Sequence, residues 1–194
     1  MPVEIEAKMR LHDIAALETK LAAAGGVRGL ELVEINTFFD TPRGDLKAGD
    51  QGLRVRLERS TDGEYEKATI THKGPRAHGR LKMRSETEIE VSDAKAAAEL
   101  LAALGYASVL SFEKRRVKWS MDGCSIEIDT LPYLGHFVEI EGPSEAIVLS
   151  VRKNLGLEGQ PMISASYISL LVTYLTEHNI ITEHVGFESS EQPA

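Results

Sequence analysis

Polar and apolar side chains alternate along the first segment of the chain. From Val3 to Met9, the charged residues Glu4, Glu6 and Lys8 share one side and apolar residues share the other. A period of two residues is typical of a β-strand, and it places the two carboxylates about 7 Å apart. At an effective dielectric constant of about 20 they repel by about 2 kcal/mol, so we expect a positive group between them.

The same alternation recurs along the chain and predicts further strands. They are expected at residues 30–40, 53–58, 65–73, 85–91, 111–119, 124–130 and 137–142. Turn signals, such as Gly74-Pro75 and Asp122-Gly123, separate several of them. Apolar residues at helical spacing predict four amphipathic helices, at residues 14–21, 93–104, 143–155 and 164–178.

The helices determine which face of the sheet is apolar. If the eight strands form one closed antiparallel sheet, the amphipathic helices must cover its apolar outer surface, so the charged face lines the interior. That interior set is Glu4, Glu6, Lys8, Arg54, Arg56, Lys73, Glu88, Glu90, Lys114, Arg116, Asp129, Glu139 and Glu141. We therefore predict an α+β fold, an eight-stranded antiparallel closed β-barrel with a charged lumen and helices packed on the outside. It spans residues 1–180, and residues 181–194 are expected to be a flexible C-terminal tail.

Composition limits the classes of partner and location. The 194 residues, 42% of them hydrophobic, fit one large domain. Thirty acidic against 22 basic residues give a net charge of −8, which argues against a general nucleic-acid or membrane-surface binder. A single cysteine, the lack of an N-terminal signal pattern and the lack of an apolar run of about 20 residues predict a cytoplasmic protein. Assembly into a homodimer is left open.

The charged interior predicts a class of ligand. Its carboxylates come in close pairs, which suit hard divalent cations such as Mg²⁺ or Mn²⁺, and its basic groups suit phosphate oxygens. A polyphosphate with a divalent cation would satisfy both sets, whereas water and internal ion pairs would do so less specifically. No Gly-x-x-x-x-Gly-Lys-Ser/Thr motif occurs, so a P-loop is excluded. The basic stretch at residues 73–84 is either a solvated loop or a lid that meets an anion.

Several of these segments resemble the CYTH, or triphosphate tunnel metalloenzyme, superfamily. Residues 4–8, Glu-Ile-Glu-Ala-Lys, are similar to its ExExK signature. Further segments resemble family blocks in family order: 39–42, 53–56, 73–75, 88–90, 113–116, 127–129 and 137–141. The resemblance covers about residues 1–178, and it implies an eight-stranded antiparallel tunnel whose lumen binds a triphosphate.

The resemblance also implies roles for individual residues. The catalytic metal would be held by Glu4, Glu6 and Glu141, and a second metal by Asp129, Glu139 and either Glu88 or Glu90. The phosphates would be bound by Arg54, Arg56, Lys73, Lys114 and Arg116. Arg84 is a further candidate for phosphate contact, because alternation places its side chain on the inward face of its strand. Lys8 lies beside the acidic pair and would orient or deprotonate the nucleophile.

Three kinds of function follow from the charged interior and from what the resemblance implies. The leading one is a metal-dependent enzyme acting on ATP, inorganic triphosphate or thiamine triphosphate, either as a triphosphatase or as a class IV-like adenylate cyclase that makes cyclic AMP and pyrophosphate. Segments 39–42, 113–116 and 166–167 most resemble bacterial class IV cyclases. The alternatives are a non-catalytic sensor that binds polyphosphate or a nucleoside triphosphate, and a structural barrel with a hydrated, ion-paired interior. The residues at the mouth of the tunnel are not identifiable from the pattern.

Overall fold

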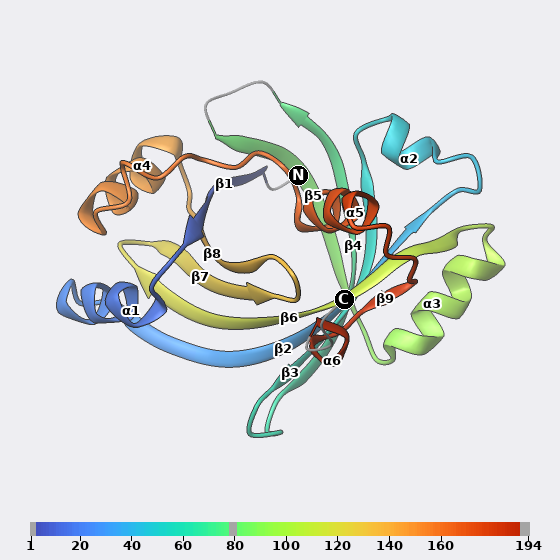
Figure 1. Ribbon diagram of the computed structural model, residues 1–194, viewed down its shortest axis with the longest axis horizontal. Coiled ribbons are helices and arrows are strands. Elements are labelled where there is room, and N and C mark those ends of the chain that lie inside the picture. Colours follow the sequence, from blue (N-terminus) through green and yellow to red (C-terminus); the bar gives the residue numbers. More distant parts are fainter. Residues whose placement is uncertain (1–2, 78–80, 191–194) are drawn as a thin grey trace.

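The computed structural model describes residues 3–77 and 81–190, and its strands curve into a barrel with helices at both sides (Figure 1). The strands are β1 (Val3–Leu11), β2 (Val27–Asp40), β3 (Gly52–Ser60), β4 (Glu66–Ala77), β5 (Lys82–Val91), β6 (Ala107–Met121), β7 (Cys124–Leu131), β8 (Gly135–Glu141) and β9 (His184–Val185). The helices are α1 (Ile14–Ala23), α2 (Asp45–Ala48), α3 (Ala94–Ala103), α4 (Glu145–Asn154), α5 (Tyr167–Glu177) and α6 (Phe187–Ser190).

The sheet closes on itself. Its strand order is β2-β3-β4-β5-β1-β8-β7-β6, and β2 also pairs with β6, which joins the two ends. Within the described residues, these eight strands pair only in antiparallel fashion, whereas β9 adds to β6 in parallel. The predicted fold class, a closed eight-stranded antiparallel barrel with a charged interior, is confirmed.

Local signals set the ends of several elements. The side chain of Asp13 accepts a hydrogen bond from the backbone N–H of Ala16 at the start of α1, and Asp93 does the same for two N–H groups of α3. Between β6 and β7, Asp122 and Gly123 both have positive φ, 51° and 75°. That combination is the two-residue hairpin turn expected for an Asp-Gly sequence.

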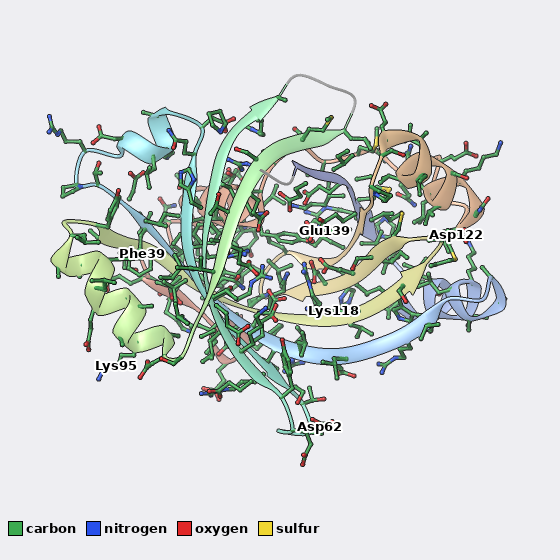
Figure 2. All side chains as sticks on the ribbon, turned by 180° about the vertical axis from the view of Figure 1, so that it is seen from behind. Phe39, Asp62, Lys95, Lys118, Asp122 and Glu139 are labelled. Carbon is green, nitrogen blue, oxygen red and sulfur yellow. The ribbon has the colours of Figure 1, made fainter. Side chains whose placement is uncertain are left out.

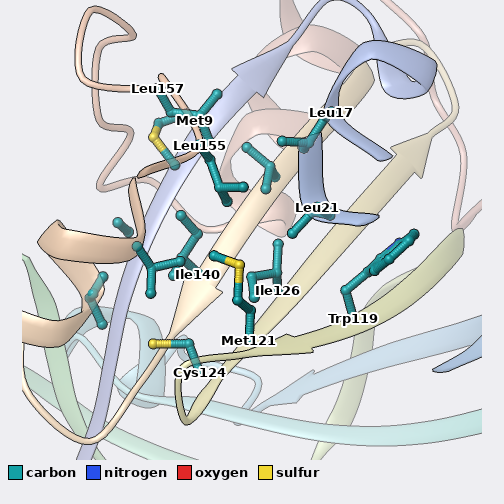
Figure 3. Packing of buried hydrophobic residues seen from close by; sticks show 14 of the residues in the cluster. Met9, Leu17, Leu21, Trp119, Met121, Cys124, Ile126, Ile140, Leu155 and Leu157 are labelled. Carbon is teal, nitrogen blue, oxygen red and sulfur yellow. The ribbon is translucent and has the colours of Figure 1, made fainter. Parts of the chain in front are cut away.

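Helices α1 and α4 cover the outer face of one side of the barrel. Leu17 of α1 and Leu155, which directly follows α4, pack on Met9, Ile126 and Ile140 from β1, β7 and β8 (Figure 3). Because side chains in a strand alternate, these apolar residues on the outside require their neighbours Lys8, Glu127, Glu139 and Glu141 to face inward. Helix α3 covers the opposite side and buries Ala97 and Leu101 against Leu53 and Val55 of β3.

Helix α5 is placed differently from the other long helices. Its buried residues Tyr167 and Leu171 pack on Phe112 and Phe137, which face the interior by the alternation of their strands. The helix therefore closes part of the lumen at one end. The pattern of apolar residues in α5 predicted a packing helix correctly, but it did not indicate that the packing surface belongs to the inner side.

The C-terminal segment differs from the predicted flexible tail where the structure describes it. His184 and Val185 pair with Ser111 and Phe112 of β6, and the Val185 side chain is fully buried. Residues 191–194 of that predicted tail, and residues 78–80 of the basic stretch, lie outside the described residues. Among the described residues, no helix is long and apolar enough to cross a membrane.

Candidate functional site

A cavity of about 890 Å³ occupies the interior of the barrel. That volume is in the range of small-molecule sites, about 300–1,000 Å³. Figure 2 shows Glu139 and Lys118 in the middle of the molecule, while Asp62, Lys95 and Asp122 lie at its periphery. The arrangement predicted from the sequence, with charged side chains inside the barrel and apolar ones outside, is what the structure has.

Arg116 is the centre of the buried charge network. Its guanidinium donates two hydrogen bonds to Asp129, at 2.7 and 2.6 Å, and one to Glu139 at 2.8 Å. It also forms ion pairs with Glu127 and, at 3.4 Å, with Glu34. Burial alone would lower the pKa of Arg116. The neighbouring carboxylates instead hold that pKa well above its ordinary value. One arginine thus contacts four carboxylates.

Glu34 is a buried site residue that our list of interior charges missed. Its carboxylate lies 3.1 Å from the Lys114 amine and 3.2 Å from Arg56, and its side chain has no exposed surface. Burial would raise the pKa of Glu34, but the neighbouring basic groups, Arg116 first, hold it well below its ordinary value. Alternation along 30–40 puts residues 34 and 36 on one face, so the signal was present in the sequence.

Lys8 is engaged in the structure by three groups. Its amine lies 3.1 Å from Glu139, donates to the carbonyl of Ala165 at 3.1 Å, and sits 3.9 Å above the ring of Tyr167. The Tyr167 hydroxyl in turn donates to Asp129 at 2.9 Å. Burial, and then Asp129, raise the pKa of that hydroxyl well above its ordinary value. Lys8 and Tyr167 therefore hold the start of α5 against the charged interior.

Acidic residues gather where β1 meets β8 and β5. Glu6 and Glu141 are directly opposite each other across the β1–β8 pair. Glu4 accepts two hydrogen bonds from the Lys73 amine, at 2.7 and 2.9 Å, and the same amine lies 2.8 Å from Glu86. Burial, and then the charge of Glu4, raise the pKa of Glu141 to about 7.

The raised pKa of Glu141 has a measurable effect on stability. The folded protein keeps a proton that the unfolded chain releases near pH 4.5, so stability falls as the pH rises from about 4.5 to 7. In EDTA at pH 8, we expect Glu141→Gln to raise the melting temperature by roughly 2–4 °C, a modest figure because the group is partly hydrated. At pH 5 the two proteins should melt together. An unchanged melting temperature at pH 8 would contradict the claim that the ionised Glu141 carboxylate destabilises the folded protein.

Arg54 and Arg56 line the cavity from β3. Arg54 donates to Thr71 at 3.1 Å, and its buried Nε has no hydrogen-bond partner among the described residues. Burial, and then the charge of Arg56, lower the pKa of Arg54 to about 10. Arg56 donates to Asn36 at 2.8 Å and lies 3.3 Å from Glu58. Arg54 is thus a cation in the cavity lining with a buried donor that has no partner among the described residues.

Two comparisons place the chain among known proteins. The sequence pattern of the CYTH domain matches residues 2–163. The chain belongs to the CYTH domain family. It is 31% identical over 183 residues to a protein named adenylate cyclase CyaB from Aeromonas hydrophila, covering 89% of this chain and 91% of that one.

Solved structures share this CYTH fold. The protein PH1819 of Pyrococcus horikoshii OT3 has a TM-score of 0.77 and 27% identity, covering 88% of this chain and 99% of that one. HpAC1 from Hippeastrum, described as having a dominant triphosphatase activity, has a TM-score of 0.67 and 19% identity, covering 88% and 96% of the two chains. At that identity, the second likeness concerns the fold alone.

The structure brings together most of the residues predicted for the CYTH site. The cavity is lined by Glu4, Glu6, Lys8, Arg54, Arg56, Lys73, Arg84, Glu88, Lys114, Arg116, Glu139 and Glu141. Asp129 lies just beneath, fully buried against Arg116 and Lys114. Glu90 is the exception, because its side chain is 71% exposed and is not part of the lining, although it lies 3.6 Å from the lining residue Lys67.

Arg84 lines the cavity but is tied to the backbone. Its guanidinium donates to the carbonyl of Gly74 at 2.8 Å and to that of Asp50 at 2.8 Å. Asp50 also accepts a hydrogen bond from the backbone N–H of Arg76 at 2.9 Å. These contacts join the basic stretch at residues 73–84 to the loop before β3. Arg84 therefore helps to shape one wall of the cavity.

The acidic side of this CYTH cavity fits a divalent cation by its chemistry. Glu4, Glu6 and Glu141 supply only carboxylate oxygens, which hard cations such as Mg²⁺ and Mn²⁺ prefer. The raised pKa of Glu141 reflects burial beside other carboxylates, and a cation there would relieve that cost. Among the described residues, no three such side chains already converge on one metal-sized position. Glu4 would have to leave Lys73 to join a metal site.

Proposed function

We propose that this CYTH protein is a divalent-metal-dependent enzyme that cleaves a phosphoanhydride bond of a triphosphate substrate. The proposal is carried by one observation: one cavity, open to solvent in part, is lined by a cluster of carboxylates and by Arg54, Arg56 and Lys73. Carboxylates suit the cation, and guanidinium and ammonium groups suit phosphate oxygens.

Each set of residues has a proposed role. Glu4, Glu6 and Glu141 hold the metal, which supplies Lewis-acid polarisation of the attacked phosphoryl group. Arg54 and Arg56 orient the triphosphate chain of the substrate and stabilise the charge that develops on its oxygens. Lys8, whose amine is engaged by Glu139, Ala165 and Tyr167, acts as a positioning residue, which is the first of the two roles, orienting or deprotonating the nucleophile, that the resemblance implied.

Two nucleophiles fit this apparatus. Attack by the ribose 3′-hydroxyl of ATP on the α-phosphorus breaks the α–β anhydride and gives cyclic AMP and pyrophosphate. Attack by water on the terminal phosphorus breaks the β–γ anhydride and releases orthophosphate. The name of the relative CyaB supports the first reaction, and HpAC1, which shares the fold, is described as having the second kind of activity.

Product analysis tests the proposal. Purified protein is incubated with ATP, inorganic triphosphate or thiamine triphosphate, each with Mg²⁺, with Mn²⁺ or with EDTA, and products are separated by ion-exchange chromatography. We expect turnover of at least one substrate only with metal. Cyclic AMP identifies cyclisation and orthophosphate identifies hydrolysis. Tight binding without turnover of any substrate would instead indicate a sensor.

The contact between Glu4 and Lys73 yields a second prediction. In the absence of metal, Glu4 occupies the Lys73 amine and repels a triphosphate. We expect Glu4→Gln to tighten metal-free binding of inorganic triphosphate roughly thirtyfold, because a unit charge about 7 Å away at an effective dielectric of about 20 contributes about 2 kcal/mol. Isothermal titration calorimetry in EDTA measures the change. Equal or weaker binding by the variant would show that Glu4 does not compete for Lys73.

A further inference from the structure

The chain continues past α5 as a short segment that returns to the barrel. Asn179 ends α5 in the left-handed conformation, with a φ of 55°, and β9 then lies along β6 (Figure 1). Among the described residues, β7 pairs with β6 only at residues 115–121, so β9 occupies a part of β6 that β7 does not reach. The CYTH match ends at residue 163, before this segment. We call residues 181–187 the C-terminal clasp.

The inner side of the C-terminal clasp packs against α5. Val185 is the partner of Phe112 in the parallel pair, so both side chains lie on the same side of the sheet. Val185 has no exposed surface and belongs to the hydrophobic cluster that contains Tyr167 and Leu171 of α5. Phe112 itself lines the cavity. Val185 therefore joins α5 to the wall of the barrel.

The outer side of the C-terminal clasp is held by Glu113 and Arg115 of β6. The Glu113 carboxylate accepts a hydrogen bond from the backbone N–H of Phe187 at 3.1 Å and lies 3.9 Å from Nε2 of His184. The Arg115 guanidinium lies 4.2 Å from the centroid of the Phe187 ring. By alternation these two residues face outward, whereas Lys114 between them faces the cavity. One strand thus carries the charge network inside and the clasp outside.

The C-terminal clasp has few of the contacts that stabilise the barrel. Within it only Val185 and Gly186 are buried, and β9 is two residues long. Segments with few buried contacts and exposed hydrogen bonds open locally while the rest of the domain stays folded. Helix α5 contributes Tyr167 and Thr173 to the cavity lining, so movement of α5 would open the cavity.

We propose that the C-terminal clasp is a latch that holds α5 across one end of the barrel, and that its release from Glu113 lets this end open. The clasp and α5 share one hydrophobic cluster, so departure of Val185 loosens the packing of the helix. The closed sheet does not need the clasp, because β2 and β6 already join its two ends. The inference concerns access to the cavity and does not depend on which reaction takes place there.

Hydrogen–deuterium exchange on the full chain, without ligand, tests the latch. Glu113→Thr removes the carboxylate that holds Phe187 and keeps a residue type suited to a strand. Val185→Ser removes the buried apolar contact from the other side of the clasp. In each variant we expect the backbone amides of α5 to exchange roughly tenfold faster or more, while those of β1 and β8 exchange as in the natural protein.

The matched control is Glu66→Thr. Glu66 is also a strand glutamate beside an arginine, 2.6 Å from Arg59, but its ion pair lies between β3 and β4. Its substitution should leave exchange in α5 unchanged. Unchanged exchange of α5 in both clasp variants would overturn the latch. Equal acceleration in α5, β1 and β8 would overturn it as well, since the clasp would then open only when the whole domain unfolds.

Discussion

Replacing Arg116 by methionine is expected to lower the free energy of unfolding by about 3–5 kcal/mol, the usual cost of leaving buried charges without their partner. Methionine fills similar space but carries no charge. Four carboxylates, those of Glu34, Glu127, Asp129 and Glu139, would then lose a common cation. Since a domain is stabilised by only about 5–15 kcal/mol, urea denaturation should show a large fall in the midpoint.

A surface arginine provides the matched control for this experiment. Arg59 lies 2.6 Å from Glu66, but both side chains are more than half exposed. Arg59→Met should therefore cost less than about 1 kcal/mol, because water and salt screen an exposed pair. Similar losses in the two variants would mean that burial does not govern the strength of the Arg116 network.

The inward face of the strands could be predicted because alternation is a property of the backbone. Any residue two positions from Glu4 along β1 must share its side of the sheet, whatever the rest of the chain does. For the same reason Arg54 and Arg56 face together, and so do Glu139 and Glu141. The apolar outer surface followed from the amphipathic helices, which need a surface on which to pack.

Position along the barrel could not be predicted in this way. Alternation tells which side a residue faces, but not how far along the strand the cavity extends. Glu90 has the same parity as Glu88, yet it lies near the end of β5 beside Lys67 and outside the lining. The pairing of β2 with β6 closes the barrel. It joins residues far apart in the sequence and has no local signal.

Tertiary packing also placed the C-terminal elements. The apolar stripe of α5 indicates a buried face but is compatible with either side of the sheet, so the contact of Tyr167 with Asp129 had no sequence signal of its own. The segment at β9 is too short for any periodicity to be visible. Val109 reaches the cavity only because of a bulge, which breaks the alternation that sequence analysis relies on.

Glu6→Gln is expected to reduce turnover of the triphosphate substrate by about a hundredfold or more, because loss of groups that merely support metal ligands already costs about 10–100-fold. Glutamine keeps the size and the polar character of the side chain, so the outer core formed by α1 and α4 should remain intact. The measurement is the rate of product formation at saturating Mg²⁺, with the melting temperature recorded for each variant.

Glu90→Gln is the control that separates position from residue type. Glu90 belongs to the same alternating acidic face in the sequence, but its exposed side chain lies outside the cavity. Its substitution should therefore leave the rate within about twofold of the natural protein, because changes to an exposed side chain outside a site have small effects. Full activity of Glu6→Gln, or equal loss in both variants, would mean that the metal is not held at the wall formed by β1 and β8.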